Sequence, residues 1–240
     1  MGQFRPEKDH VLQLRAFKKA LEILAAGPSD SDEDAPEWVA GARLVLVGGA
    51  RNEEDEARVE SLKRTSGELG IADRVEWRVN APFDGKGSLR QGLAECAAGM
   101  HCMWNEHFGI SVVESQAAGC VIVAHDSGGP RMDIVVPVDG ERTGCRARSV
   151  NGFAAALVAI LRASQAGSAV YTPVEEASEG VDEADAAAKA HDEELVYAKV
   201  QNAGRRSALR FADVKFGRDF CHALDPALAL VPGLPPRKRA

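Results

Sequence analysis

Short apolar runs alternate with longer segments of mixed polarity over the first two thirds of the chain, and each pattern predicts one kind of element. In the longer segments apolar residues recur at helical spacing, and glycine follows several of them as a stop signal. Helices are predicted at 11–26, 53–69, 88–98, 109–118 and 151–163. The short apolar runs predict strands at 43–47, 74–79, 99–104, 121–125 and 143–147.

This alternation predicts an α/β fold, a Rossmann-like parallel sheet with helices on both faces. Residues 1–164 form the main domain in this prediction, and 196–225 add C-terminal helices to the same domain. Between them, 165–195 is an acidic, alanine-rich insertion whose composition fits either a solvated helix or disorder. The proline-rich, basic segment 226–240 is predicted to be a flexible tail.

Composition narrows the class of protein. The 240 residues, 45% of them hydrophobic, suffice for one well-packed domain. The net charge of -7 argues against a general nucleic-acid binder, although much of the acid is concentrated in 30–37 and 175–194. The five cysteines include no C-x-x-C pair, which disfavours a disulfide framework or a zinc site and favours a reducing compartment. No apolar run approaches the roughly 20 residues that span a bilayer, so this piece is expected to be soluble, with any membrane anchor on a missing part.

The polar loop between the strand predicted to end near Trp104 and the helix predicted from Gly109 is the most informative segment. Ligands of an open α/β sheet bind beyond the carboxyl ends of its strands, where this loop lies. The backbone N–H groups of Phe108, Gly109 and Ile110 have no acceptors within the helix. Together with the helix dipole they favour an anion such as phosphate.

Two glutamates eight positions apart, Glu106 in the loop and Glu114 on the helix, are candidate contacts for a sugar nucleotide. Glu114 lies among apolar residues, where a carboxylate is costly to bury unless it accepts hydrogen bonds. A ribose diol offers two such donors. A solvent-facing Glu114 on the open side of the helix explains the pattern equally well, and an E-x7-E spacing alone is a weak signal.

The histidines divide into two groups. His107 lies in the polar loop and is a further candidate contact for the donor, whereas His101, in a predicted strand, is interpreted as a core or rim histidine. No Ser/His/Asp or Cys/His set occurs at interpretable positions, so hydrolase chemistry has no support.

Glu106 and Glu114, with Phe108-Gly109 between them, resemble the E-x7-E signature of the retaining glycosyltransferases of family 4, which have the two-domain GT-B fold. Longer runs are similar to one branch of that family, the α-1,2-mannosyltransferases that act on dolichol-linked oligosaccharides. These runs are Gly2 to His10, Met103 to Glu114 and His125 to Pro137. The similarity covers about residues 1–164 and, more faintly, 197–224. It implies that the chain is the C-terminal half of a GT-B enzyme, which binds the nucleotide sugar.

The resemblance implies a role for each matching position. Arg5 and Lys8 would hold the diphosphate and stabilise the GDP leaving group, although without the resemblance they fit the start of a charged helix better. Glu114 would bind the ribose, and Glu106 would face the mannose. Glu106, Arg5 and Lys8 are the implied catalytic residues. The remaining implied donor contacts are Gly2, His107, Phe108, Gly109, Ile110, Ser127, Gly128 and Gly129. The last three belong to a predicted tight turn on the pocket floor, for which an ordinary Gly-Pro turn is the alternative.

The implied reaction is the retaining transfer of mannose from GDP-mannose to a dolichol-linked oligosaccharide at the cytosolic face of the endoplasmic reticulum membrane. The family works without a bound metal, so no metal or other cofactor is expected. Asp30-Ser31-Asp32, in an acidic loop, is interpreted as solvated charge and not as a metal motif. The family's N-terminal domain, which supplies acceptor binding and membrane association, is missing, so transfer is expected only in the complete enzyme. The alternatives are a family 4 enzyme with another donor and a non-catalytic nucleotide-sugar-binding subunit.

Overall fold

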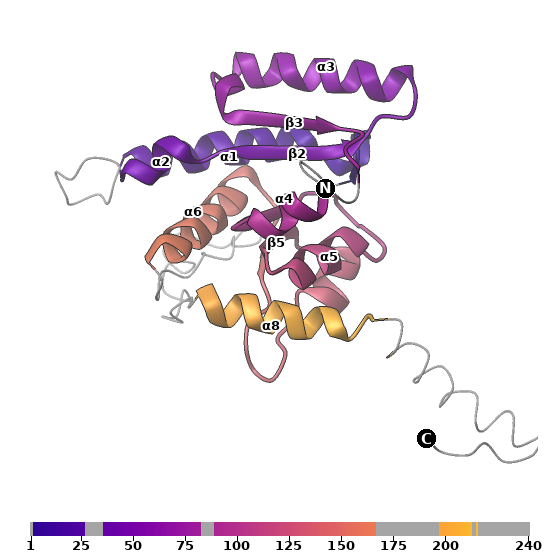
Figure 1. The fold of residues 1–240 in the computed structure, drawn as a ribbon, viewed down its shortest axis with the longest axis vertical. Helices are drawn as coiled ribbons and strands as arrows, with labels where there is room; N and C mark the ends of the chain where they lie inside the picture. The colour runs from indigo at the N-terminus through magenta and orange to yellow at the C-terminus, as the bar shows by residue number, and fades with distance from the viewer. Residues whose placement is uncertain (1, 27–35, 83–88, 167–196, 213–214, 216–240) are drawn as a thin grey trace, which may run out of the picture.

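The computed structural model describes residues 2–26, 36–82, 89–166, 197–212 and Lys215. Within these ranges strands and helices alternate as predicted (Figure 1). The strands are β1 (Gly2–Gln3), β2 (Leu44–Gly49), β3 (Val75–Val79), β4 (Ala98–His101), β5 (Val121–His125) and β6 (Cys145–Ala147). The helices are α1 (His10–Ala25), α2 (Glu37–Gly41), α3 (Glu53–Glu68), α4 (Leu89–Glu95), α5 (Ile110–Ala118), α6 (Val150–Ala166) and α8 (Tyr197–Leu209). Short helical turns occur at η1 (Pro6–Lys8), η2 (Ala72–Arg74) and η3 (Pro130–Ile134).

All the strands pair in parallel, as predicted, but they form two sheets of three strands in place of one. The strand orders are β1-β2-β3 and β4-β5-β6. In the first sheet Leu44 lies opposite Val75, and in the second Val123 lies opposite Cys145. β1 is only two residues long and pairs with β2. The α/β class is confirmed, and each strand presents its carboxyl end on the same side as its partners.

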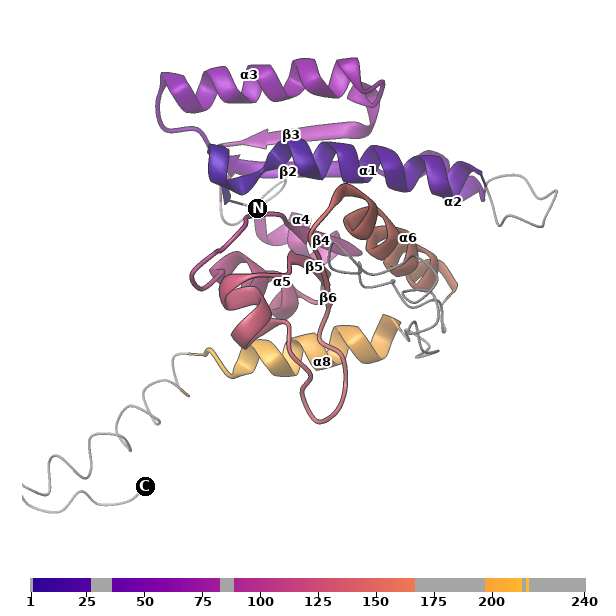
Figure 2. The same cartoon turned by 180° about the vertical axis from the view of Figure 1, so that it is seen from behind.

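The second sheet is covered by helices on both faces. Along β5, Val121 and Val123 pack against Phe153 and other residues of α6. Ile122, on the opposite face, packs with Val112 of α5. This alternation is what a strand between two helical layers requires. Figure 2 shows β4, β5 and β6 between α5 and α6.

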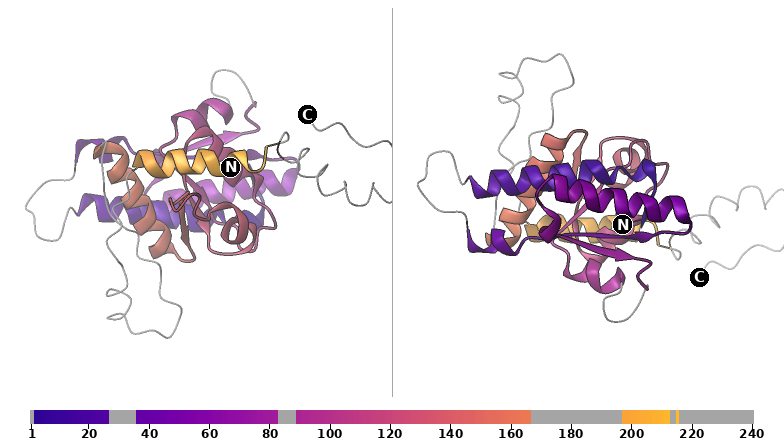
Figure 3. Two further views of the ribbon diagram at one scale, coloured as in Figure 1. Left: turned by 90° about the horizontal axis from the view of Figure 1, so that it is seen from below. Right: turned by 90° about the horizontal axis from the view of Figure 1, so that it is seen from above.

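The first sheet packs its Leu44 and Leu46 side chains with residues of two helices, Leu14 of α1 and Val59 of α3. These helices lie side by side above the sheet (Figure 3, right). Val45 points to the other face and stays 37% exposed. Within the described residues, the predicted helices on both faces are therefore present for the second sheet, whereas the first sheet is covered mainly on one face.

Several element boundaries differ from the prediction. β4 ends at His101, and Trp104, expected in this strand, is 71% exposed in the following loop. β2 continues through Gly48 and Gly49, which pair with β1. Gly48 allows this pairing because it has no side chain, and an added Cβ would overlap the carbonyl oxygen of Gly2 on β1. The five-residue α2 was not predicted, because so short a helix has no recognisable apolar period.

Helix α8 packs chiefly against α5 and also contacts β5 (Figure 3, left). Its Ser207 hydroxyl donates to the carbonyl oxygen of Ile134 at 3.0 Å, and Ser207 is fully buried. No described helix has the length and hydropathy to cross a bilayer. Most of the predicted insertion 165–195, the tail 226–240 and Asp30-Ser31-Asp32 lie outside the described residues.

Candidate active site

Three loops that follow the carboxyl ends of β1, β4 and β5 meet at one place. The first carries Lys8 in η1, the second is the polar loop 102–109, and the third begins at Asp126. Lys8 Nζ lies 2.8 Å from Glu106 Oε2, which joins the first loop to the second. The backbone N–H of Asn105 donates to Ser127 Oγ at 2.7 Å, which joins the second to the third. The sequence-predicted residues Lys8, Glu106 and Ser127 are thus brought together at the edge where a parallel sheet binds ligands.

The Lys8 ammonium is held from several sides. Besides Glu106, its Nζ donates to Met103 Sδ at 3.1 Å. A Cβ added to Gly2, whose φ is +148°, would stand 3.5 Å from Lys8 Cε, so the glycine lies directly beside the lysine stem. The side chains of Lys8 and Glu106 are 22% and 18% exposed. The ion pair is therefore largely shielded but keeps an open side.

Glu106 is held as a carboxylate. Partial burial by itself raises the pKa of Glu106, but the hydrogen bond and charge of Lys8 outweigh it, and the net pKa is lowered. His101 and the backbone N–H of His107 act in the same direction. The site therefore holds one cation and one anion side by side at neutral pH.

His101 ends β4 directly beneath this pair. Its Nε2 lies 3.4 Å from Glu106 Oε2, and its Nδ1 lies 3.3 Å from Ser111 Oγ in the first turn of α5. The side chain is 5% exposed. Burial, followed by the charge of Lys8, lowers the pKa of His101 to about 4. The ring is consequently neutral at physiological pH, although it touches a carboxylate.

Gly128 and Gly129 form the support under the polar loop. Gly128 has a left-handed φ of +53°, and a Cβ there would overlap the carbonyl oxygen of Glu106. A Cβ on Gly129 would overlap the carbonyl oxygen of His107, and the Gly129 N–H donates to Glu106 O at 2.8 Å. The tight turn expected here in fact leads straight into the helical turn η3. Its glycines contact the loop backbone, because only residues without a side chain allow so close an approach.

Helix α5 begins one residue after Gly109, whose φ of +97° is left-handed. The N–H groups of Phe108, Gly109 and Ile110 have no acceptor among the described residues. Phe108 and Ile110 are exposed, and Gly109 between them is buried. The Phe108 and Phe211 rings pack edge to face at 5.3 Å between centroids. The helix start therefore carries amides without acceptors, partly exposed to solvent.

Three sequence-predicted residues stand apart from the ion pair. Arg5 is exposed, and no described residue forms an ion pair with it. His107 is also exposed. Glu114 is half-buried on α5, on the same side as Ile110, and this burial raises its pKa. No side-chain interaction of these three reaches Lys8 or Glu106 within the described structure, although the Arg5 carbonyl oxygen accepts from the Lys8 N–H at 3.2 Å. The predicted roles of their side chains therefore depend on a ligand that would span them.

Three contributors to the cluster, namely His101, Met103 and Ser111, were not predicted as site residues. His101 was interpreted as a core or rim histidine from its strand position alone. A histidine at the last position of a strand, next to a polar loop, is nevertheless a signal that it reaches the functional edge of the sheet. Ser111 and Met103 carry no comparable signal.

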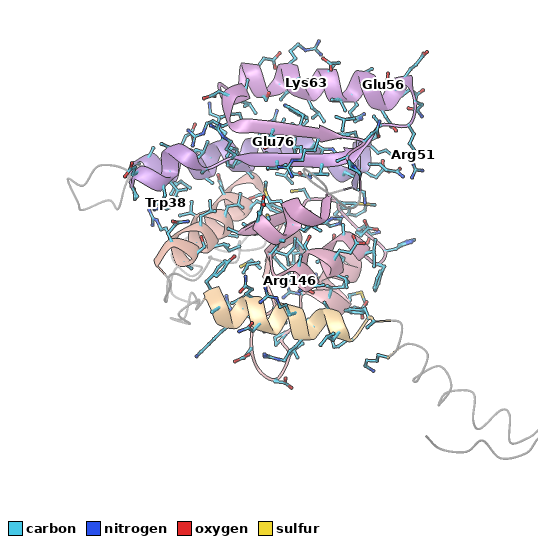
Figure 4. The ribbon with its side chains drawn as sticks, viewed as in Figure 1. Trp38, Arg51, Glu56, Lys63, Glu76 and Arg146 are labelled. Carbon is cyan, nitrogen blue, oxygen red and sulfur yellow. The ribbon has the colours of Figure 1, made fainter. Side chains whose placement is uncertain are left out.

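A surface cavity of about 470 Å³ lies elsewhere, between α3 and the ends of β2 and β3. It is lined by Ala50, Glu53, Glu56, Ala57, Val59, Glu60, Lys63 and Val79. Figure 4 shows Glu56 and Lys63 on α3, on the far side of the molecule from α8. None of the predicted site residues lines this cavity. No cluster of three metal-ligating side chains occurs among the described residues.

Comparison with known proteins identifies related sequences. The family model described as "Glycosyl transferases group 1" matches residues 1–162. A GDP-Man:Man(3)GlcNAc(2)-PP-Dol alpha-1,2-mannosyltransferase of Xenopus laevis is 52% identical over 161 residues, 67% of this chain and 30% of the relative. The human protein of the same name is 48% identical over 68% of this chain and 31% of its own length. The Xenopus tropicalis protein of that name is 40% identical over 94% of this chain and 37% of its own length. The chain thus spans about a third of the length of these relatives.

Solved structures support the fold. Anabaena Alr3699/HepE in complex with UDP and glucose matches with a TM-score of 0.59 at 16% identity, over 94% of this chain and 47% of that chain. The C-terminal domain of a glycosyl transferase group 1 family protein (LpcC) from Francisella tularensis matches with a TM-score of 0.52 at 15% identity. That match covers 87% of this chain and 82% of the Francisella domain. The architecture is that of one half of a GT-B glycosyltransferase, and, with the family model matching two thirds of its length, the chain belongs to the glycosyl transferases group 1 family.

Proposed function

We propose that this chain is the donor-binding domain of a retaining α-1,2-mannosyltransferase that uses GDP-mannose. Relatives named as GDP-Man:Man(3)GlcNAc(2)-PP-Dol alpha-1,2-mannosyltransferase, at 40–52% identity, support the choice of donor and acceptor. Because the chain spans about a third of their length, mannosyl transfer to a dolichol-linked oligosaccharide is proposed for the complete enzyme. Donor binding is proposed for this chain.

The observation that carries the proposal is the ion pair of Lys8 with Glu106, a residue of the loop that leads into α5. Lys8 Nζ lies 2.8 Å from Glu106, and the amides of Phe108 to Ile110, which have no acceptor among the described residues, begin two residues further along the same loop. A cation held near a helix start forms a favourable site for a diphosphate. When the bond to mannose breaks, negative charge builds up on the GDP leaving group, and these groups would stabilise it.

The remaining parts of the donor follow from this placement. Arg5, exposed on the same loop as Lys8, would add a second cation to the diphosphate. Glu106 and His107 would face the mannose, and Glu114, one turn into α5, would accept hydrogen bonds from the ribose. The raised pKa of the half-buried Glu114 fits a carboxylate that awaits hydroxyl donors. Ser127, Gly128 and Gly129 would act by supporting the loop backbone, and Gly2 by giving Lys8 its room.

No metal or other cofactor is part of the proposal. Charge on the diphosphate would be neutralised by Arg5, Lys8 and the α5 amides. The complete enzyme would act at the cytosolic face of the endoplasmic reticulum membrane, since its acceptor is carried on dolichol. The part outside this chain would supply acceptor binding and membrane association.

Calorimetric titration of the 240-residue chain with GDP, GDP-mannose and UDP-glucose tests the donor. We expect GDP-mannose and GDP to bind and UDP-glucose to bind at least tenfold more weakly. Equal or tighter binding of UDP-glucose would instead favour another group 1 enzyme, an alternative kept open by structural neighbours solved with UDP.

The Lys8 assignment has its own test. Lys8→Ala removes a cation from the diphosphate site, and a charge-assisted hydrogen bond of this kind contributes about 1.5–3 kcal/mol, so GDP affinity should fall by at least tenfold. Lys63→Ala is the matched control, because Lys63 pairs with Glu60 on the distant α3. Unchanged GDP affinity in Lys8→Ala would remove the central observation from the proposal.

A further inference from the structure

We propose that His101 is a positioning residue that fixes the orientation of the Glu106 carboxylate toward the sugar of the donor. This inference rests on the proposed function. It arises from three successive contacts. Ser111 Oγ lies 3.3 Å from His101 Nδ1, and His101 Nε2 lies 3.4 Å from Glu106 Oε2. Glu106 Oε2 in turn lies 2.8 Å from Lys8 Nζ. These contacts cross from α5 through β4 to the polar loop and end on η1.

The buried Nε2 of His101 makes no hydrogen bond within the described part of the chain. The carboxylate oxygen Glu106 Oε2 lies 3.4 Å from it. A buried N–H without an acceptor costs about 1–3 kcal/mol. The 3.4 Å separation is long for an N–H···O hydrogen bond, but such bonds in unliganded sites often shorten when substrate binds. The ring is therefore placed to support Glu106 from behind.

The tautomer of His101 follows from its two neighbours. The charged groups that face it are Lys8 and Glu106, and burial with the Lys8 charge keeps the ring neutral. A neutral imidazole donates from one nitrogen and accepts at the other. If Nδ1 carried the proton, the Nε2 lone pair would face a carboxylate. The stable arrangement therefore has the Ser111 hydroxyl donating to Nδ1 and the Nε2–H directed at Glu106.

This arrangement restrains the carboxylate without changing its charge. Lys8 and His101 both reach Oε2, and the His107 backbone N–H also donates to the carboxylate. Lys8 alone is a flexible point charge, and it would be drawn toward a diphosphate when the donor binds. His101 is itself buried at the end of β4 and would stay in place. It would hold Glu106 toward the mannose while Lys8 turns to the phosphate.

The tautomer can be observed directly in the 240-residue chain. Long-range proton–nitrogen correlation spectra, assigned through His101→Gln, should show His101 neutral with the proton on Nε2 from pH 7.5 down to about pH 5.5. Ser111→Ala should reduce the preference for that tautomer. A His101 that is charged at pH 7, or that carries its proton on Nδ1, overturns the inference.

The effect on the donor separates positioning from simple packing. Because Glu106 is assigned to the sugar, His101→Leu should weaken GDP-mannose binding fivefold or more and leave GDP within twofold. His101→Gln, which retains a donor near the Nε2 position, should recover most of the loss. In the double variant with Glu106→Ala, His101→Leu should add less than twofold. Equal losses for GDP and GDP-mannose, or no loss for either, would refute the positioning role.

Failure of the proposed function is distinguishable from failure of this inference. If the parent chain binds neither GDP nor GDP-mannose, the donor assignment fails. The spectra then test only the contact between His101 Nε2 and Glu106. An Nε2 proton whose resonance does not respond to Glu106→Ala would refute that contact. If the parent binds GDP-mannose and His101→Leu binds it equally well, only the positioning role fails.

Discussion

Gly128 shows how one residue fixes the geometry of the candidate site. Its left-handed φ and the absence of a side chain allow the segment after β5 to contact the carbonyl of Glu106. Two separate physical demands meet at this position, a backbone conformation that L-residues rarely adopt and a space that holds no methyl group. Gly129, which has an ordinary helical φ of -57°, meets only the second demand.

Replacing Gly128 by alanine tests both demands together. Backbone strain of this kind costs about 1–3 kcal/mol, and the overlap with the Glu106 carbonyl adds to it, so the free energy of unfolding should fall by about 2–4 kcal/mol. Urea denaturation followed by circular dichroism measures the change. Gly140→Ala is the matched control, because Gly140 has a similar φ of +77° with nothing within 4 Å of an added Cβ. If the two variants lose equal stability, crowding against the loop contributes nothing.

At the same scale, the residue pair at the centre of the site was beyond sequence reasoning. Lys8 and Glu106 are 98 positions apart, and their contact depends on which strands are neighbours. Each residue was nevertheless proposed separately, Glu106 from its place in the loop beyond a predicted strand and Lys8 from the family resemblance. His101 was missed because the strand was predicted to continue through Trp104, whereas β4 ends at His101.

At the scale of elements, α8 shows that a polar contact anchors a helix to the turn η3, which follows β5. Ser207 is fully buried, and its hydroxyl donates to Ile134 O at 3.0 Å and accepts from Arg210 Nη2 at 3.0 Å. Gly204 lets the same helix approach closely, since a Cβ there would stand 3.3 Å from Thr143 O. The helix therefore depends on small residues along one side.

Ser207→Ala should lower the free energy of unfolding by about 1–2 kcal/mol, because a buried carbonyl loses its donor. Thermal and urea unfolding give the value. Ser164→Ala serves for comparison, since the Ser164 hydroxyl only donates to Leu161 O within its own helix. A loss in Ser207→Ala no greater than that of Ser164→Ala would mean that α8 is held by apolar packing alone.

Most helices and strands were predictable, and the exceptions have physical causes. The buried run of β5 and the long periodic α1 and α3 follow directly from the hydrophobic pattern. β4 was predicted too long because apolar residues continue through Trp104, whereas the parallel ladder with β5 ends opposite Ala124. A strand ends where its partner's hydrogen bonds end, and a single sequence does not show this.

For the whole molecule, three buried histidines link stability to pH. Burial lowers the pKa of His125. The pKa of His10 is lowered to about 4, first by burial, and so is the pKa of His101. The unfolded chain takes up protons on both residues below about pH 6.5, whereas the folded chain does not until about pH 4. The contribution of each neutral histidine to the free energy of unfolding is therefore present above about pH 6.5. It is lost as the pH drops toward 4, by up to about 1.4 kcal/mol per pH unit for each histidine.

His10→Phe should reduce this acid sensitivity by about 2 kcal/mol between pH 7.5 and 5.0, since the proton uptake of His10 in the unfolded chain is gone. Phenylalanine keeps the stacking on Phe4, whose ring centroid lies 5.0 Å from that of His10. Urea unfolding of parent and variant at the two pH values gives the difference. An unchanged pH dependence would mean that His10 titrates normally in the folded chain.

Hydrogen bonds and close backbone contacts fix the conformation of the polar loop that follows β4. Asn105 is fixed to Ser127, Glu106 O receives the Gly129 N–H, and the backbone behind both is crowded by glycine contacts. A nucleotide that binds to such a loop loses its own conformational freedom but orders little of the protein. The entropy cost of ordering the loop is therefore part of folding and not of ligand binding. Variation in the segment after β5 would thus alter affinity by loosening the polar loop that it supports.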